Sequence, residues 1–320
     1  MAELDPGWQH DESPFHSVSW QIQARLGMGD KMAQIGQRTI RGFLPQQHRD
    51  FYPQLPFLLV GSVDGAGQPW ASIVCGQPGF LTTPSSEQLS ISARPLAGDL
   101  LMENLHLNAP LGVLGIELPT RRRNRLNGKV SALDEHGFAI AVDQAFGNCP
   151  KYIQSREPTF IASADLHPGL PVLADRLDAK SLAIIASADT LFIATSCLIV
   201  PESERPWQGV DISHRGGQPG FVAINNDDSL TLPDYLGNFH FRTLGNIQLE
   251  PRAGLLFVDF ETGDILQVAV RGSIVWDGPR LDSFAGAQRL VDLQVTQTRL
   301  LPGALPLRFT PPQYSPVLPV

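Results

Sequence analysis

Residues 76–80 and 217–221 spell the same pentapeptide, GQPGF, and this internal repeat constrains the fold more than any other feature of the chain. Each copy is followed by a polar turn and a short strand-like stretch, TTPSSEQ then LSIS after the first and INNDD then SLTL after the second. Farther on, Asn104 and Asn246 each begin a short helical turn, a proline and an apolar run. The same order of features in both halves favours a tandem duplication over chance.

The register between the two halves is expected to drift slightly along the chain. The pentapeptides begin at positions 76 and 217, and the asparagines stand at 104 and 246. The segment RNRLNGKVSAL aligns with LQVAVRGSIVW when Gly128 is placed against Gly272. Small insertions in loops would produce such a drift.

Composition sets limits on the class of protein. The chain has 320 residues, of which 42% are hydrophobic, enough to form two medium-sized cores. A net charge of -8 argues against a nucleic-acid partner held by a broad basic surface. The polar, acidic N-terminus is unlike a secretory signal, and no apolar run approaches the length of a membrane span. We therefore expect a cytoplasmic protein without a nucleic-acid or membrane partner.

The strand pattern predicts a mainly β fold. The stretch FLLVGSVDGAGQPWASIVCG has two apolar runs around a Gly-rich turn, and LFVDFETGDILQVAVRG repeats the arrangement around ETGD. Runs of five to eight residues between turn signals recur over residues 56–145 and 188–277. This spacing is typical of closed antiparallel β-barrels with flanking helices.

The domain boundaries follow from the same pattern. Asp30 is expected to cap a helix over residues 30–44, and the segment after Pro279 is expected to form a helix that leads into a last strand. We expect five segments: an N-terminal helical segment (1–55), a first barrel repeat (56–155), a connector (156–187), a second repeat with the C-terminal helix (188–310) and an extended tail (311–320).

The chemistry concentrates in residues 211–246. The sequence SHRGG places Ser213, His214 and Arg215 directly before Gly216 and Gly217 at a strand end. Such a bend can direct backbone N–H groups and an arginine fork at one anion, and a phosphate fits that description. The residues that follow in a loop and helix start supply further candidates: Asp234, Tyr235, Asn238 and Arg242. The alternative is structural: Arg215 pairs with an acid such as Asp211, and the glycines only form a bulge.

The first repeat lacks the arginine and one glycine at the matching place, ASIVCGQPGF, which predicts one dominant site. It has its own basic run, PTRRRNRLNGK, in which strand alternation sends Arg121, Arg123 and Arg125 to one face and Arg122 to the other. These arginines either reach the phosphate of the other repeat or lie solvated on a hairpin. Cys149 has no histidine nearby in sequence, so an inert thiol is the more typical interpretation.

Residues 211–274 resemble the flavin-nucleotide-binding branch of the pyridoxamine 5'-phosphate oxidase-like proteins, the FMN-binding split β-barrels. The motifs that carry the resemblance are S-x-R-G-G-x-P-G-F at 213–221, P-D-x-x-G-N at 233–238 and P-R-x-G-L-L-F at 251–257. Residues 14–153, with PFH, LPFLLVGSVDGAGQPWAS, GIELPTRRRNRLNG and GNCPKYI, resemble the first half of longer bacterial members.

The resemblance implies FMN bound between two split barrels, here as a pseudo-dimer within one chain, with further homodimerisation open. The cofactor-binding residues that it implies are Ser213, His214, Arg215, Gly216, Gly217, Asp234, Asn238, Arg242 and Asn246, with Arg121, Arg123, Asn148 and Tyr152 from the facing half. No clear substrate-phosphate site of the true oxidase is present, so pyridoxamine phosphate oxidation is not implied.

The implied function is an FMN-dependent oxidoreductase that acts on a small molecule, with NADH or NADPH as a candidate donor and no metal site. The sequence names no catalytic acid or base. One alternative is a non-catalytic protein that stores or senses a flavin, or haem held by His214. Another is an interaction module in which SHRGG is only a turn.

Overall fold

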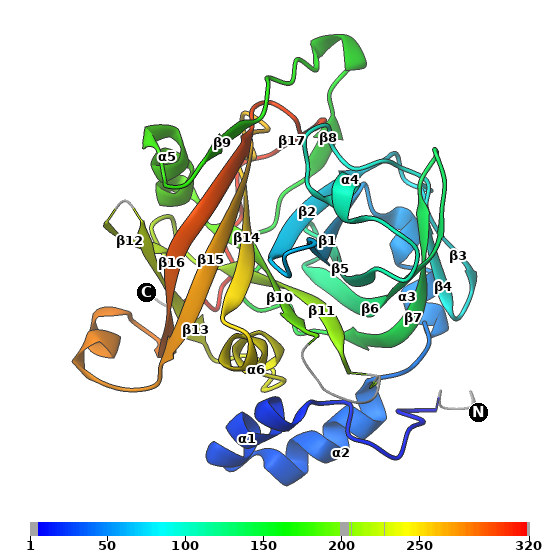
Figure 1. Cartoon of the computed structure of the whole chain (residues 1–320), viewed down its shortest axis with the longest axis vertical. Coiled ribbons are helices and arrows are strands. Elements are labelled where there is room, and N and C mark those ends of the chain that lie inside the picture. The colour runs from blue at the N-terminus through cyan, green and yellow to red at the C-terminus, as the bar shows by residue number, and fades with distance from the viewer. Residues whose placement is uncertain (1–5, 199–204, 206, 227, 319–320) are drawn as a thin grey trace.

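The computed structural model describes residues 6–198, 205, 207–226 and 228–318, and the chain is mainly β (Figure 1). The first five residues of the N-terminal segment, the last two of the tail and one residue of INNDD lie outside this range. Two antiparallel sheets lie side by side, and the helices lie at their periphery.

The first sheet has seven strands in the order β2-β1-β5-β6-β7-β4-β3. Its strands are β1 (Phe57–Val63), β2 (Pro69–Cys75), β3 (Leu81–Ser85), β4 (Gln88–Ile91), β5 (Pro110–Glu117), β6 (Arg122–Leu133) and β7 (Phe138–Gly147). The sequence DGAGQP forms the expected hairpin turn, because β1 and β2 pair antiparallel up to Val63 opposite Pro69.

The second sheet follows the order β11-β10-β14-β15-β16-β13-β12, with β9 paired to β16. Its strands are β9 (Val172–Ala174), β10 (Thr190–Cys197), β11 (Gly209–Gly216), β12 (Ala223–Asn226), β13 (Ser229–Tyr235), β14 (Arg252–Val258), β15 (Ile265–Val275) and β16 (Ala287–Leu301). A separate two-stranded sheet pairs β8 (Pro158–Phe160) with β17 (Leu307–Phe309). If β1 and β10 are each numbered as the first strand of their sheet, both sheets have the strand order 2-1-5-6-7-4-3.

Both copies of GQPGF form the same turn. In each, the phenylalanine N–H donates to the glutamine carbonyl at 2.9 Å, from Phe80 to Gln77 and from Phe221 to Gln218. The last glycine of each copy has a positive φ, 98° at Gly79 and 83° at Gly220, a conformation that glycine adopts without strain. The turn takes the chain off the end of β2 or β11 and starts the next hairpin.

The expected closed barrels do not form. Each sheet is an open path in which the strand before GQPGF and the strand after it lie at opposite ends. The turn sends β3 to pair with β4, and β12 to pair with β13, so neither returns to close the sheet. Strand β2 instead packs against β14, and β11 against β5, so each of these edge strands is covered by the other sheet.

The helices and the short 3-10 segments lie outside the sheets. The helices are α1 (Ser17–Arg25), α2 (Gly29–Thr39), α3 (Gln46–Arg49), α4 (Leu101–Asn104), α5 (Ala179–Ser187) and α6 (Arg242–Leu249). The 3-10 segments are η1 (Tyr52–Gln54), η2 (Ser163–Asp165) and η3 (Pro279–Ser283).

Two helix predictions were wrong. Asp30 lies in the first turn of α2 rather than at its cap, which is Met28, and the helix ends at Thr39 rather than near residue 44. The expected C-terminal helix is the five-residue η3 followed by the long strand β16. Residues 287–301 form a strand because β16 pairs with β13 on one side and with β15 on the other. This pairing outweighs the helix-like spacing of apolar residues in the local sequence.

The predicted alignment of Gly128 with Gly272 was also wrong. Gly128 of β6 pairs with Leu111 of β5. The equivalent of Leu111 in the second sheet is Ala253 of β14, and Ala253 pairs with Val270, so Val270 rather than Gly272 is the equivalent of Gly128. The 142-residue difference at Asn104 and Asn246 therefore holds through β6 and β15 without further drift.

The two sheets share a core. One cluster of buried side chains joins Leu59, Ile73 and Leu114 of the first sheet to Phe192 and Leu256 of the second. Two glycines allow the closest approach. A Cβ on Gly112 would lie 2.6 Å from the Val210 carbonyl oxygen, and one on Gly254 would lie 2.4 Å from the Pro69 carbonyl oxygen.

Gly254→Ala is expected to lower the free energy of unfolding by about 1–3 kcal/mol, because the added methyl group meets backbone that cannot rotate away. Gly65→Ala is the matched control, since nothing lies within 4 Å of a Cβ at that turn position. Urea denaturation of both variants measures the difference. Equal stabilities would show that the sheets are not in tight contact at Gly254.

Candidate functional site

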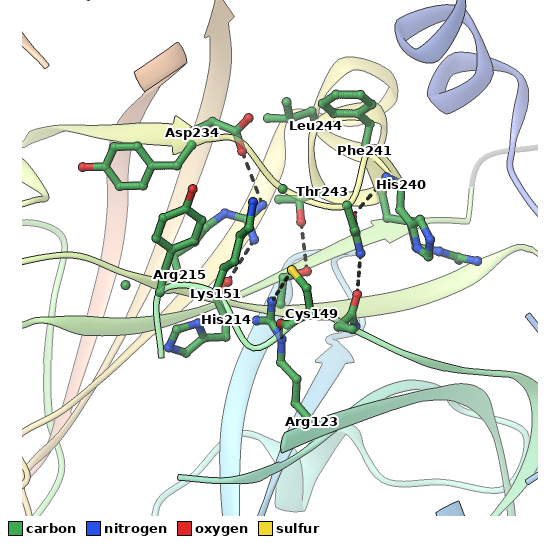
Figure 2. Close-up of a pocket in the computed structure, with 18 of the residues that line it drawn as sticks. Arg123, Cys149, Lys151, His214, Arg215, Asp234, His240, Phe241, Thr243 and Leu244 are labelled. Atoms are coloured by element: carbon green, nitrogen blue, oxygen red, sulfur yellow. Dashed lines mark hydrogen bonds and ion pairs between the residues drawn. The ribbon is translucent and has the colours of Figure 1, made fainter. Parts of the chain in front are cut away.

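A pocket lies where β6 of the first sheet meets β11, β13 and the start of α6 in the second (Figure 2). The cavity measures about 110 Å³. Ten of the thirteen sequence-predicted site residues line it: Arg123, Asn148, Tyr152, Ser213, His214, Arg215, Gly216, Asp234, Asn238 and Arg242. The structure thus brings residues from both halves of the chain to one place.

Three predicted residues do not line the pocket. Arg121 precedes β6 with a positive φ of 59° and donates to the carbonyls of Ile153 and Gln313. Gly217 makes the turn, where a Cβ would lie 2.4 Å from the Phe221 Cβ. Asn246 is buried under α6 and donates to Thr195 at 3.0 Å.

Arg215 lies at the end of β11 and projects into the pocket (Figure 2). One of its Nη atoms donates to the His214 carbonyl at 3.0 Å, and the other lies 3.9 Å from an Asp234 carboxylate oxygen. The pairing with Asp211 that sequence left open does not occur. Strand pairing stays regular up to Gly216, so the glycines do not form a bulge.

Arg123 and Arg125 face the pocket and Arg122 faces away, as predicted, but Arg121, predicted to share their face, precedes β6 and lies outside the pocket. Arg122 points away from the pocket, where it donates to the Gln47 carbonyl and stacks on Phe51. Arg123 enters the pocket and donates to the Cys149 carbonyl at 2.9 Å, with the Cys149 thiol 4.0 Å away. This places the loop at Asn148–Tyr152 against β6.

The loop is also tied to the second half. The Asn238 amide donates to the Asn148 side-chain oxygen at 2.5 Å, and the Tyr152 hydroxyl donates to the Leu236 carbonyl at 3.0 Å. The rings of Tyr152 and Tyr235, which both line the pocket, lie 5.3 Å apart. Sequence reasoning did not include Lys151, which also lines the pocket.

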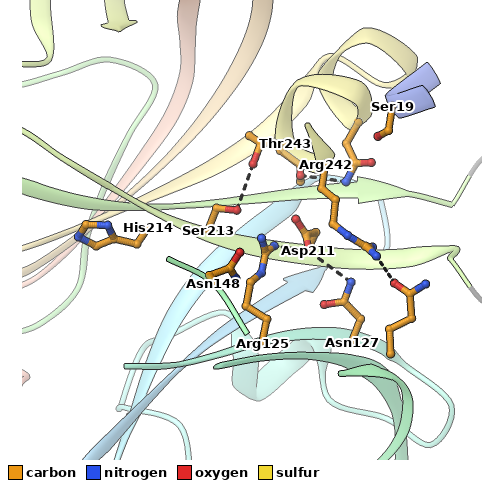
Figure 3. A network of polar contacts seen from close by, with 12 residues as sticks. Ser19, Arg125, Asn127, Asn148, Asp211, Ser213, His214, Arg242 and Thr243 are labelled. Carbon is orange, nitrogen blue, oxygen red and sulfur yellow. Dashed lines mark hydrogen bonds and ion pairs between the residues drawn. The ribbon is translucent and has the colours of Figure 1, made fainter. Parts of the chain in front are cut away.

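A second group of polar side chains lies deeper (Figure 3). Arg125 pairs with Asp211, and the Asn127 amide donates to the same carboxylate at 3.3 Å. Arg242 donates to the Gln144 side-chain oxygen and, at 3.2 Å, to the Pro14 carbonyl. Strand alternation placed Arg125 beside Arg123, but nothing in the sequence distinguished Arg125 as the arginine that lines the pocket in place of Arg121.

The charges of the pocket are unbalanced. Five cationic side chains line it, and Asp234 is the one carboxylate among the described lining residues. The cationic side chains are Arg123, Arg125, Lys151, Arg215 and Arg242. Burial lowers the pKa of Arg123 and of Arg242 to about 10, and burial with Arg123 nearby lowers that of His214 well below its usual value. The desolvated, cationic arginines favour an anionic ligand.

The matching place on the other side of the molecule lacks the cluster of cations. When the two halves of the chain are aligned, the positions equivalent to Asp211, Arg242 and Asn127 are occupied by Trp70, Leu100 and Ala269. These three side chains pack together as a small buried cluster. Val74 stands where Arg215 stands, and Gln267 where Arg125 stands. One of the two equivalent places is therefore lined by several cations, and the other holds this apolar cluster beside a buried polar group of Ser72, Asp99 and Gln267.

Not every equivalent contact has diverged. Asn104 donates to Ser62 at 2.9 Å, and Asn246 donates to Thr195 at 3.0 Å, from equivalent positions to equivalent partners. The two halves therefore keep this helix-to-strand hydrogen bond, while the residues at the pocket positions differ between them.

A scan against family models finds no match, and a search of curated proteins finds none. The solved structures that are similar include HupZ of Group A Streptococcus, at 12% identity over 40% of this chain and 97% of that chain, with a TM-score of 0.32. A putative pyridoxamine 5'-phosphate oxidase from Lactobacillus delbrueckii is 12% identical over 39% of this chain and 94% of that one, with a TM-score of 0.30.

An FMN-binding protein from Syntrophomonas wolfei is 13% identical over 37% of this chain and 80% of that chain, with a TM-score of 0.27. Each of these neighbours covers only about two fifths of this chain. Their low TM-scores add no weight to a function.

Two searches of the described residues concern other kinds of site. They contain no group of three or more His, Cys, Asp or Glu side chains placed to hold a metal ion. Within the same residues, no helix is both long and apolar enough to cross a membrane.

Buried histidines around the site predict acid sensitivity. Burial lowers the pKa of His16 and His48 to about 4 and that of His240 to about 3. An unfolded chain takes up these protons near pH 6.5, so stability falls as the pH drops from 6.5 towards 4. Asp99 acts in the opposite sense, because burial raises its pKa to about 6, but three groups oppose one.

His16→Asn tests one part of this effect. His16 caps α1 by accepting from the Ser19 N–H, a role that asparagine can also fill. We expect the loss of unfolding free energy between pH 7 and pH 5 to shrink by about 2 kcal/mol in this variant. Urea titrations at the two pH values measure it, and an unchanged pH dependence would remove His16 from the account.

Proposed function

We propose that this chain is a flavoprotein that binds FMN in the pocket between β6 and β11 and acts as an FMN-dependent oxidoreductase. The proposal includes a tandem duplication, in which the two halves form a pseudo-dimer of split-barrel units with one functional site. The single observation that carries it is the buried excess of cationic side chains at the end of the S-x-R-G-G strand.

The donor set fits the phosphate end of the cofactor. Arg123, Lys151 and Arg215 would hold the phosphate, and the Ser213 hydroxyl with the Gly216 backbone would face the ribityl chain. The cavity of about 110 Å³ is smaller than the several hundred Å³ typical of pockets for ligands of this size. The half-buried Tyr152 and Tyr235 at the mouth are therefore expected to move when the ring system enters.

The chain's residues would bind and orient the cofactor, and the cofactor, when bound, supplies hydride or single-electron transfer. Arginines desolvated in the pocket would regain favourable interactions when an anion replaces the lost water. Burial lowers the pKa of both lining histidines, which disfavours the imidazolium form that a general acid needs.

The second candidate is a protein that binds a cofactor without turnover. The unpartnered Nε2 atom of His214 would suit a haem iron, since it is buried and belongs to a neutral ring that lines the pocket. Haem would need more space than a flavin. The cationic excess favours the phosphate-bearing ligand.

Visible spectra of the purified protein, taken before and after anaerobic addition of NADH or NADPH, separate these functions. A bound flavin that bleaches with a nicotinamide supports the oxidoreductase. A flavin that stays oxidised supports storage, and a haem spectrum or a protein that takes up no added FMN would overturn the proposal.

A further inference from the structure

The deeper polar group in Figure 3 is separate from the proposed phosphate site along the same strands. Asp211 and Arg215 are four residues apart on β11, a separation of about 13 Å at roughly 3.3 Å per residue. Arg123 and Arg125 are two residues apart on β6 and face the same pocket. The pocket therefore has a mouth, at Arg123 and Arg215, and an inner end, at Arg125 and Arg242.

The inner end keeps one uncompensated positive charge. Arg125 and Arg242 are 5% and 6% exposed, and among the described residues the one carboxylate beside them, Asp211, is 2% exposed and forms its ion pair with Arg125. His240 and His16, the other ionisable groups packed against them, are kept neutral by burial, and the Cys197 thiol stays protonated because burial raises its pKa to about 11. A buried cation without a counter-charge is costly.

Hydrogen-bonding capacity at the inner end is also unused. The Nε atoms of Arg125 and Arg242 are buried and have no hydrogen-bond partner, and the same is true of the Nδ1 atom of His240. These groups belong to side chains that line the pocket. In a native protein such atoms are usually satisfied by a bound group or water.

The surroundings favour an organic anion. The guanidinium carbons of Arg125 and Arg242 lie 5.2 and 4.7 Å from the centre of the Phe146 ring. Leu114, Phe241 and Leu244 line the same pocket. Apolar walls accept a hydrocarbon body, while the planar guanidinium groups match a carboxylate.

We propose that Arg125 and Arg242 form an inner subsite for a small monocarboxylate, distinct from the phosphate-binding mouth. The charge selects a monoanion, because one carboxylate neutralises the inner end whereas a phosphate dianion would leave it negative. At the mouth, Arg123, Lys151 and Arg215 line the pocket with Asp234, which Arg289 also approaches at 3.5 Å, so the larger cationic excess suits a dianion. That the monocarboxylate is the substrate rests on the proposed function; its binding does not.

Calorimetric titration of the full chain with propanoate tests the subsite, with propanamide as the neutral isostere and inorganic phosphate as the dianion. Propanoate is expected to bind at least tenfold more tightly than propanamide, and Arg242→Gln is expected to weaken it tenfold or more. Arg122→Gln, on the outward face of β6, is the matched control and should bind propanoate like the parent chain. Equal binding of propanoate and propanamide would overturn the proposal.

Asp211→Asn gives a second test that does not depend on removing a cation. It raises the inner charge from one to two, so the preference is expected to shift from propanoate towards phosphate by tenfold or more. Circular dichroism establishes that the variant is folded. An unchanged preference in the folded variant would contradict the charge argument.

FMN binding, followed by quenching of its fluorescence, separates this proposal from the proposed function. Propanoate binding without FMN binding would support the inner subsite and overturn the flavoprotein. FMN binding without propanoate binding would do the reverse. Mutually exclusive binding of the two would show one site and overturn the separate subsite.

Discussion

Arg125→Ala is expected to lower the free energy of unfolding by about 3–5 kcal/mol, the largest effect of any single substitution considered for this chain. The variant leaves the Asp211 carboxylate, 2% exposed, without its arginine. It also removes a guanidinium that packs on Phe146. Urea denaturation at pH 7 measures the change.

Arg122→Ala is the matched control, because Arg122 lies three positions before Arg125 on β6 and faces the opposite side of the strand. Arg122 makes one hydrogen bond to the Gln47 carbonyl and stacks on Phe51, so its loss is expected to cost about 1 kcal/mol or less. The double variant Arg125→Ala, Asp211→Asn is expected to lose less free energy of unfolding than the two single variants lose together, since Arg125 and Asp211 are directly paired. A double variant as unstable as the sum of both single changes would contradict this pairing.

Arg215→Ala is expected to weaken FMN binding by about 1.5–3 kcal/mol, or roughly tenfold to more than a hundredfold, with little loss of stability. Arg215 lies at the mouth. Among the described residues, its one carboxylate neighbour within 4 Å is Asp234, at 3.9 Å, which Arg289 also approaches at 3.5 Å. Asp234 thus keeps a cation when Arg215 is removed. Fluorescence titration of FMN measures the dissociation constant.

The control for that titration is Arg121→Ala. Arg121 was a sequence-predicted site residue, but it donates to the carbonyls of Ile153 and Gln313 outside the pocket. Its removal should leave the FMN dissociation constant unchanged. An Arg215→Ala variant that binds FMN like the parent would remove Arg215 from the phosphate site.

Much of the fold could be predicted from the repeat and the turn signals. The hairpin at Asp64–Gly67 and the strand around Arg215 follow from alternation and turn residues, which act locally. Whether each sheet closes into a barrel could not be predicted, because this depends on which strand pairs with the strand after GQPGF. The failed helix after Pro279 has the same cause: β16 is decided by pairing with β15 and β13, which lie far away in sequence.

The site shows the same division. The sequence SHRGG and the arginines of β6 predicted an anion-binding site, and ten of the predicted residues line one pocket. Which arginine of β6 enters the pocket depends on where the strand begins, and it begins at Arg122, after Arg121 has turned away with a positive φ. The apolar cluster of Trp70, Leu100 and Ala269 was invisible in sequence, because its members meet only through the packing of two sheets.

The central claim is that one of the two equivalent places holds the cofactor and the other does not. Equilibrium dialysis of the purified, ligand-stripped chain against FMN, followed by absorbance of the flavin in the protein chamber, counts the sites directly. We expect saturation at one FMN per chain. Two per chain would show that the apolar side also binds, and none would show that the charged pocket serves another ligand.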